Sequence, residues 1–363
     1  MIETKKIIKL CEDCGACVQI CSFLKYYCKS PKELANRFIK NPMENMEVLY
    51  SCSLCGLCHT VCKQDLNPGM MCMEARKELF TDEHKQFFPE YFVYDFMIPK
   101  MWSIRTHQFL SSSPFFTYHK GNSDTVFFPG CSLSAYSPHI VLKSYKYLQK
   151  EIPGTGIMLN CCGKPTLDTG DVQNFEKIFS ATFKKLAKYN VKNIILTCIN
   201  CQKVFEDNSD IKVYNIYEIL DKKGLPQQIN GKKEEITIHD SCPARHIPKL
   251  RTSVRNILKD MNFTVSEMKF ANEKTMCCGG GGCSTLGNTA LSFRHTQTRA
   301  KQANNMIVTY CAHCRERYSS YNKSFHILDI IFGSNDKKRL KEYNDSWHNW
   351  LNRWYLKKRL QIR

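Results

Sequence analysis

The chain has 363 residues, of which 43% are hydrophobic and 12% aromatic, enough for packed cores in more than one domain. No run approaches the roughly 20 apolar residues of a membrane-spanning helix, so the sequence predicts none. The formal net charge is +18, and 21 residues are cysteine. The first cysteine motif starts at Cys11, which leaves no room for a signal peptide, and we therefore expect a cytoplasmic protein. Because the cytosol keeps thiols reduced, this many cysteines indicate metal ligands rather than disulfides.

The first cysteines form two copies of the spacing CxxCxxCxxxC, one starting at Cys11 and the other at Cys52. Three cysteines at intervals of three wrap one cubane 4Fe–4S cluster, and the fourth reaches across to the other cluster in two-cluster ferredoxins. We therefore expect one cluster on Cys11, Cys14, Cys17 and Cys62, and the second on Cys52, Cys55, Cys58 and Cys21. Zinc is the alternative, but structural zinc sites usually show two separated CxxC pairs.

Helix-start signals follow both quartets. Ser30-Pro31 and Asn67-Pro68 each offer an N-cap residue followed by proline at the first helical position, and residues 70–80 are good helix formers. The proline that usually follows the fourth cysteine is replaced by Ser22 in one motif and by Lys63 in the other. The sequence thus predicts a mainly helical two-cluster ferredoxin domain over residues 1–80 and an aromatic-rich connector over residues 81–122.

From residue 124 onward the chain repeats itself once. A single cysteine, a Cys-Cys-Gly triplet and a CxxC pair occur twice, at offsets of 111 to 116 residues, and the flanking segment 213–220 also matches 324–331. The first copy contains Cys131, Cys161, Cys162, Cys198 and Cys201, and the second contains Cys242, Cys277, Cys278, Cys311 and Cys314. We assign residues 123–222 and 233–333 to these two copies and expect each copy to gather its five cysteines.

Short apolar runs precede the cysteines in both copies, at residues 125–128, 193–196, 236–238 and 306–308. Helical patterns lie between these runs, for example the one that Ser137-Pro138 opens, with Val141, Tyr145 and Leu148 on one face. Alternating strands and helices predict an α/β domain with a parallel sheet in each copy. Ligands of such sheets gather at the carboxyl ends of the strands, where these cysteines fall.

The Cys…CysCysGly…CysxxCys pattern resembles the cysteine-rich (CCG) domain family, known from the disulfide-reducing unit of heterodisulfide reductase. The ferredoxin module resembles the two-cluster ferredoxin of that enzyme, and the whole arrangement resembles the fused form found in the membrane-type enzyme and the iron–sulfur subunits of glycerol-3-phosphate, lactate and glycolate oxidoreductases. The resemblance implies two further 4Fe–4S clusters of the noncubane type, one in each copy. The fold class expected is a helical two-cluster ferredoxin module followed by a duplicated α/β CCG domain with parallel sheets.

The resemblance implies a heterodisulfide reductase-like enzyme in which the cubanes pass single electrons to the two CCG sites for disulfide or thiol chemistry. As candidate catalytic residues we take Cys162, Cys278, Arg245 and His246; His239, His313 and Arg315 are further polar neighbours. Among these polar residues, histidine is expected to supply protons and arginine to hold an anionic substrate. No nucleotide or flavin motif is present. We therefore expect a redox partner, either a flavoprotein or a membrane cytochrome subunit. The alternative is a non-catalytic electron-transfer subunit of an FAD-linked 2-hydroxy-acid or glycerol-3-phosphate dehydrogenase.

The remaining features carry weaker expectations. Cys28, Cys72 and Cys283 belong to no spacing motif and are expected in cores, and Cys283 also lies close enough to the second site to line it. The run Gly279–Gly282 is expected to let backbone approach a cluster. Residues 334–363 are predicted to form a basic amphipathic helix that packs on its own domain, a partner or a membrane surface; its aromatic and apolar positions are Tyr343, Trp347, Trp350, Leu351 and Trp354. Because cluster charge offsets part of the positive surplus, we expect no nucleic-acid partner.

Overall fold

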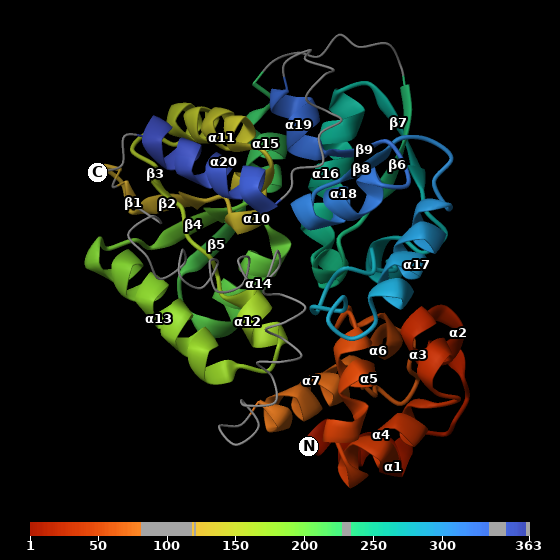
Figure 1. The fold of residues 1–363 in the computed structure, drawn as a ribbon. Helices are drawn as coiled ribbons and strands as arrows, with labels where there is room; N and C mark the ends of the chain where they lie inside the picture. The colour runs from red at the N-terminus through yellow and green to blue at the C-terminus, as the bar shows by residue number, and fades with distance from the viewer. Residues whose placement is uncertain (81–117, 120, 227–233, 334–345, 361–363) are drawn as a thin grey trace.

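The computed structural model describes residues 1–80, 118–119, 121–226, 234–333 and 346–360, so most of the predicted connector lies outside the described residues. Figure 1 shows three units: a helical N-terminal module and two α/β halves that pack side by side. The predicted fold class is confirmed. In the described part of the chain, no helix is long and apolar enough to cross a bilayer.

The N-terminal module consists of short helices. They are α1 (Ile2–Leu10), α2 (Ala16–Ile20), α3 (Ser22–Tyr27), α4 (Pro31–Lys40), the 3-10 helix η1 (Met43–Asn45), α5 (Met46–Ser51), α6 (Leu57–Thr60) and α7 (Pro68–Leu79). Both predicted N-caps form, since the Ser30 side chain accepts a hydrogen bond from the Glu33 N–H and the Asn67 side chain accepts one from the Met70 N–H. Leu34, Phe38 and Leu49 are fully buried in the core of this module.

The first α/β half contains a sheet with strand order β1-β3-β2-β4-β5. Its elements are β1 (Tyr118–His119), β2 (Thr125–Phe128), α10 (Cys131–Tyr136), α11 (Pro138–Glu151), β3 (Gly156–Met158), α12 (Lys164–Asp168), α13 (Val172–Lys188), β4 (Asn193–Leu196), α14 (Ile199–Asn208), β5 (Lys212–Asn215) and α15 (Ile216–Lys223). The strands β2 to β5 pair in parallel, while the two-residue strand β1 is antiparallel to β3. The parallel sheet was predicted; the short antiparallel edge strand was not.

The second half repeats this plan with strand order β7-β6-β8-β9, and every pair is parallel. Its elements are β6 (Glu234–His239), η3 (Cys242–His246), α16 (Pro248–Asp260), β7 (Phe263–Glu267), η4 (Asn272–Lys274), α17 (Thr289–Ala300), β8 (Ile307–Thr309), α18 (Ala312–Ser319), β9 (Ser324–His326) and α19 (Ile327–Phe332). The segments matched in the sequence, 213–220 and 324–331, form the same unit in both halves, a strand (β5 or β9) that leads directly into a helix (α15 or α19).

The two halves pack on each other in a reciprocal way. The last helix of the first half, α15, contacts the first long helix of the second half, α16, while α11 contacts α19. One apolar cluster runs through both halves and includes Ile157 and Ile216 from the first half and Ile236 and Ile327 from the second, all fully buried. The two halves therefore share one apolar cluster, and each half also has a smaller apolar cluster of its own.

The C-terminal helix α20 (Ser346–Arg359) lies along α10 and α11 of the first half (Figure 1). Leu356 is fully buried, and the Asn352 side chain donates a hydrogen bond to the Ala135 carbonyl at 2.7 Å. Leu351 and Trp354, which were expected on the packing face, are instead 36% and 44% exposed. The helix thus packs on its own domain, and Leu356 is part of that contact. Tyr343 and the side chains of Trp347 and Trp350, which were also expected on the packing face, lie outside the described residues.

Candidate functional site

The two cysteine loops of the N-terminal module have the same backbone shape. Asp13 and Leu54 both adopt a left-handed conformation, with φ of 54° and 51°, and so do Gly15 and Gly56, with φ of 73° and 76°. These pairs occupy matching places on either side of the second cysteine of each motif. Left-handed backbone at a residue other than glycine is uncommon, so its recurrence in both motifs indicates that each loop is folded to one shape around its three cysteines.

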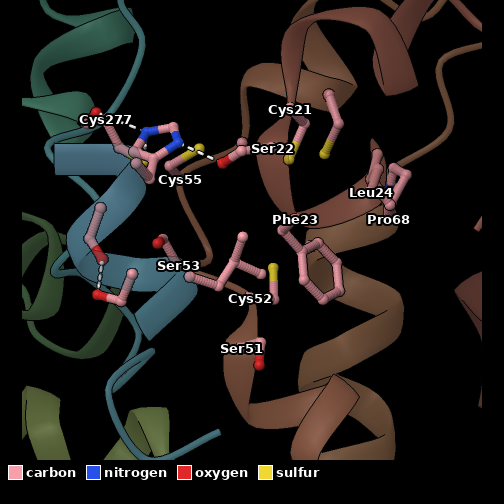
Figure 2. Close-up of a pocket in the computed structure, with 17 residues that line it drawn as sticks. Cys21, Ser22, Phe23, Leu24, Ser51, Cys52, Ser53, Cys55, Pro68 and Cys277 are labelled. Carbon is pink, nitrogen blue, oxygen red and sulfur yellow. Dashed lines mark hydrogen bonds between the residues drawn. The ribbon is translucent and has the colours of Figure 1, made fainter. Parts of the chain in front are cut away.

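The structure brings together the two sets of four cysteines that the sequence paired across the motifs. Cys21, Cys52, Cys55 and Cys58 line one cavity (Figure 2). In the other set, burial and the neighbouring thiols of Cys11 and Cys62 together raise the pKa of Cys17 to about 11. Among the residues that the structure describes, no three potential ligands converge closely enough for a single metal ion. Thiols spaced around a cavity are the donor set that a 4Fe–4S cluster needs.

In the first α/β half, the five cysteines lie at the carboxyl ends of three parallel strands. Cys131 follows β2, the pair Cys161-Cys162 follows β3, and Cys198 precedes α14, which contains Cys201. The Cys161 thiol is 3.9 Å from the Cys131 sulfur. Gly130 lies against this group, since a Cβ atom there would be 3.5 Å from the Cys201 sulfur. All five residues therefore border one site.

The second half builds the equivalent site. Cys242 follows β6, Cys311 follows β8, and the Cys314 thiol of α18 lies 3.3 Å from the Cys278 sulfur. This thiol lowers the pKa of Cys278 to about 6. In the first half the neighbouring thiols of Cys161 and Cys201 likewise lower the pKa of Cys162. Because the thiolate is the metal-binding form, these lowered pKa values favour Cys162 and Cys278 as ligands.

Three of the 21 cysteines lie outside these four sets. Cys72 is fully buried, and its hydrogen bond to Cys52 lowers the pKa of the Cys52 thiol to about 7. The Cys28 thiol donates to the Leu24 carbonyl at 3.3 Å. Cys283 points at the Pro165 carbonyl of the first half, at 3.7 Å. Cys72 and Cys28 thus support the module that carries the clusters, whereas Cys283 lies at a junction between units.

The two α/β sites are neighbours. Tyr217, fully buried at the start of α15, donates a hydrogen bond to the Tyr310 carbonyl at 3.3 Å. Burial raises its pKa well above the usual range, and the thiols of Cys311 and Cys198, one from each half, raise it further. One phenol therefore lies between the two sites.

The glycine run of the second half rests against a cysteine loop of the N-terminal module. A Cβ atom on Gly282 would be 2.7 Å from the Ser53 backbone, and one on Gly281 would be 2.9 Å from the Ser53 carbonyl oxygen. At this junction Cys55 and Cys277 lie within hydrogen-bond reach of each other (Figure 2). The glycines therefore allow the backbone to approach the second ferredoxin loop closely, which places one ferredoxin cysteine beside one cysteine of the second α/β site.

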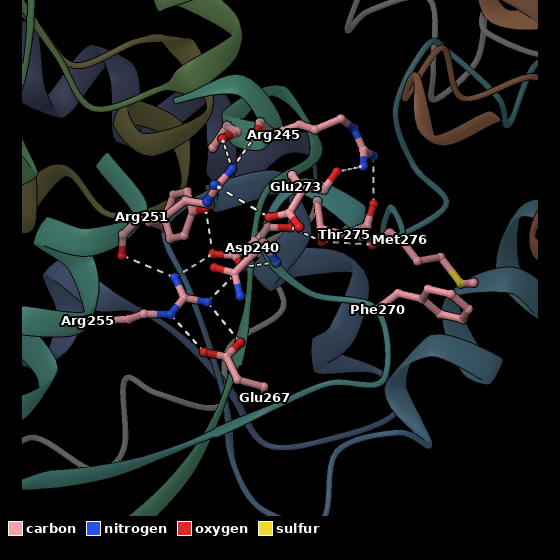
Figure 3. A network of polar contacts seen from close by, with 12 residues as sticks. Asp240, Arg245, Arg251, Arg255, Glu267, Phe270, Glu273, Thr275 and Met276 are labelled. Carbon is pink, nitrogen blue, oxygen red and sulfur yellow. Dashed lines mark hydrogen bonds and ion pairs between the residues drawn. The ribbon is translucent and has the colours of Figure 1, made fainter. Parts of the chain in front are cut away.

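The polar candidates named from the sequence have mostly structural partners. Arg245 is buried, and its guanidinium donates to the carbonyls of Glu273, Thr275 and Cys55, so in this structure it holds backbone segments in place (Figure 3). His239 is fully buried beside the Tyr318 hydroxyl, and burial lowers its pKa to about 3. His246 is exposed at the end of η3.

The two remaining candidates lie around Cys314. The Nε2 of His313 is 3.0 Å from the Gly280 carbonyl oxygen, and the Arg315 guanidinium lies 4.5 Å from the centre of the Tyr136 ring. Both side chains therefore hold neighbouring segments in place. Of the polar candidates, His246 and His313 combine an exposed side chain with a place next to a cysteine site, and the His313 side chain is 45% exposed.

An ion-pair network fixes the strand end that carries Cys242. Arg255 makes two hydrogen bonds to Asp240, at 2.8 and 3.1 Å, and two to Glu267, at 2.7 and 2.8 Å (Figure 3). Burial alone would raise the pKa of Asp240, but its hydrogen bonds to Arg255, the Asn272 N–H and the Tyr310 hydroxyl outweigh that effect and lower it. The loop after β6 is thereby held rigidly.

Sequence reasoning missed Arg76, Ser22 and His295. Arg76 is fully buried and donates to the carbonyls of Leu49, Cys52, Asp168 and Gly282, which come from all three units. His295 of α17 hydrogen-bonds to Ser22 and to Cys277. Arginine in a helix gives no signal for such a role, but the serine in place of the usual proline after Cys21 was a visible departure from the motif.

Family comparisons agree with this arrangement. Residues 10–67 match the family described as 4Fe-4S dicluster domain, and residues 125–206 and 236–316 each match the family described as cysteine-rich domain (CCG). An iron–sulfur protein of Methanococcus maripaludis is 25% identical over 376 residues, with 94% of this chain and 70% of the relative covered.

Two further relatives are subunits of reductases. A subunit of the CoM/CoB fumarate reductase of Methanothermobacter marburgensis is 23% identical, with 86% of this chain and 68% of the relative covered. A subunit of the dihydromethanophenazine:CoB–CoM heterodisulfide reductase of Methanosarcina acetivorans is 22% identical, with coverages of 78% and 76%. The crystal structure of a hypothetical protein from Helicobacter pylori has the same fold, with a TM-score of 0.50, 14% identity and coverages of 85% and 68%. The chain is a heterodisulfide reductase-like iron–sulfur protein in which a 4Fe-4S dicluster domain precedes two tandem cysteine-rich domains.

Proposed function

We propose that this chain is a disulfide-reducing iron–sulfur protein that holds four 4Fe–4S clusters, two cubanes in the N-terminal module and one noncubane cluster in each α/β half. The observation that carries the proposal is that both five-cysteine sets are complete and lie at matching strand ends, next to each other. When bound, such clusters accept and release single electrons. A redox partner, a flavoprotein or a membrane cytochrome subunit, would supply those electrons to the N-terminal module.

The reaction is the two-electron cleavage of one S–S bond. The disulfide takes up two electrons and two protons and yields two thiols, so two one-electron sites side by side match the stoichiometry. Tyr217 and the apolar cluster shared by the two halves connect the two sites. Cys131, Cys198 and Cys242 are partly exposed among the described residues, which leaves each site a face for a substrate sulfur.

The first test is composition and spectroscopy of the anaerobically purified protein. We expect about 16 iron atoms per chain with matching sulfide. Addition of thiols to the oxidised protein should change the EPR signals of the α/β sites. Stoichiometric zinc without sulfide would refute cluster binding, whereas normal clusters that no thiol perturbs would identify a pure electron carrier.

The second test uses one variant of each half. Cys162→Ala and Cys278→Ala should each abolish reduction of a disulfide by the dithionite-reduced protein, because the electron pair requires both sites. Cys28→Ala, which changes a cysteine outside the four sets, serves as the control and should keep the activity. Full activity of either site variant would contradict the paired mechanism.

A further inference from the structure

One imidazole bridges the N-terminal module and the second α/β half. His295 lies on α17, and its Nδ1 atom contacts the Ser22 hydroxyl at the start of α3. Its Nε2 atom lies 3.0 Å from the Cys277 carbonyl oxygen and 3.4 Å from the Cys277 sulfur. Figure 2 shows Ser22, Cys55 and Cys277 facing the same cavity, between the ferredoxin loop and the second half.

The donors and acceptors of this bridge can be assigned from chemistry. The carbonyl oxygen of Cys277 can only accept, so the proton of the neutral ring must be on Nε2. Nδ1 is then the acceptor, and the Ser22 hydroxyl must donate to it. The serine thus selects the tautomer that directs an N–H at the carbonyl and the sulfur of Cys277.

The bridge exists in one of the two halves. Gly163 and Gly279 follow the cysteine pairs with the same left-handed backbone, at φ of 80° and 84°. In the first half, Phe175 and Ile178 cover this glycine, whereas in the second half Ser292, His295 and Thr296 do so. Apolar side chains against this glycine are therefore compatible with the fold. The polar side chains occur in the half that contacts the ferredoxin loop.

The serine is equally specific. Ser22 is the first residue of α3, a position that proline fits well, so the backbone gives no reason to replace the usual proline there. Lys63, at the matching place in the other motif, is exposed. The hydroxyl is present at the one of the two positions that faces His295.

We propose that Ser22 and His295 are positioning residues that hold an N–H against the Cys277 sulfur and thereby raise the reduction potential of the cluster bound by the second half, which makes that cluster the first acceptor of electrons from the N-terminal module. This inference rests on the proposed function. A hydrogen bond to a ligand sulfur stabilises the reduced cluster more than the oxidised one, because the reduced form is more negative. The first half lacks such a donor at this place.

The test is an EPR-monitored redox titration of the holoprotein, with the Cys278→Ala variant identifying the signal of the second half. His295→Phe should lower the midpoint potential of that signal by about 59 mV, which corresponds to a tenfold change in the equilibrium constant of a one-electron reduction. Ser22→Ala should shift it in the same direction by less, and His295→Gln, which keeps an N–H donor, should restore most of the potential. Lys63→Ala is the matched control and should change nothing.

The outcomes distinguish a failure of this inference from a failure of the proposed function. Wild-type protein without the expected iron and sulfide would refute the proposed function itself. Normal cluster content with the same potentials in wild type, Ser22→Ala and His295→Phe would refute the bridge alone. Where His295→Phe fails to assemble clusters, Ser22→Ala decides, because it removes one hydroxyl. An equal shift of all four signals would show a general structural effect and would also overturn the inference.

Discussion

Replacement of Arg76 tests whether one side chain holds the three units together. Its guanidinium has five N–H groups, and all five donate: two to the Leu49 carbonyl, at 2.7 and 3.0 Å, and one each to the carbonyls of Cys52, Asp168 and Gly282, at 2.7 Å. The Arg76→Met variant keeps most of the volume but leaves four buried carbonyls without this donor.

The magnitude follows from the nature of the contacts. A hydrogen bond to a charged group contributes about 1.5–3 kcal/mol, but burying the guanidinium offsets much of the sum. Removal of one partner from a buried charged network typically costs about 3–5 kcal/mol, and we expect Arg76→Met in that range. The free energy of unfolding of Arg76→Lys should lie between those of wild type and Arg76→Met, since an ammonium group has three N–H donors and lacks the planar geometry of the guanidinium.

The assay is urea unfolding of the anaerobic holoprotein, followed by far-UV circular dichroism and by cluster absorbance. Lys77→Met, at the exposed neighbouring position on α7, is the control for the change of residue type and charge. Hydrogen exchange of the amides near Gly282 and Asp168 should accelerate in Arg76→Met. If its free energy of unfolding falls within about 1 kcal/mol of that of Lys77→Met, Arg76 does not join the units as the geometry indicates.

Two further perturbations probe other parts of the fold. Burial raises the pKa of Asp329 to about 6, although the Tyr136 hydroxyl donates a hydrogen bond to it. Ionisation of Asp329 therefore lowers the free energy of unfolding: the loss grows from about pH 4 to about pH 6 and is complete above pH 6. Relative to Asp329→Asn, wild type should therefore gain about 1 kcal/mol of unfolding free energy when the pH falls from 8 to 5.5, and a constant difference in urea titrations would contradict this. Leu356→Ala should cost about 2–4 kcal/mol in thermal or urea unfolding, because Leu356 is fully buried, whereas Leu351→Ala, 36% exposed, should cost little; equal effects would mean that α20 does not pack through Leu356.

Cysteine spacing predicted most of the candidate site because the spacing itself encodes the geometry. Three cysteines at intervals of three define a loop, and the fourth must reach elsewhere, so the sequence alone indicated that Cys21 would join Cys52, Cys55 and Cys58. The runs at 125–128 and 193–196 coincide with β2 and β4, since buried parallel strands read as short apolar runs. The strands β3, β5, β7 and β9 were not named, because β3 starts with a glycine, β9 has a single apolar residue between a serine and a histidine, and β5 and β7 carry exposed polar side chains.

The role of Arg245 could not be predicted because sequence gives no distance between units. Beside Cys242 it looked like a ligand for a substrate anion, but the fold brings the Cys55 carbonyl, 190 residues away in sequence, within 3.3 Å of its guanidinium. Arg76 is a similar case. Both depend on long-range packing that no local pattern records.

The apolar cluster shared by the two halves has a consequence for how their stability is coupled. Because Ile157 and Ile216 pack in the same cluster as Ile236 and Ile327, we expect unfolding of one half to expose apolar surface of the other. We therefore expect a mutation at any of these four residues to destabilise both halves. The cysteines of the two sites are not part of this cluster, so a change to the cysteines of one half can alter its chemistry while the stability shared through the cluster is kept.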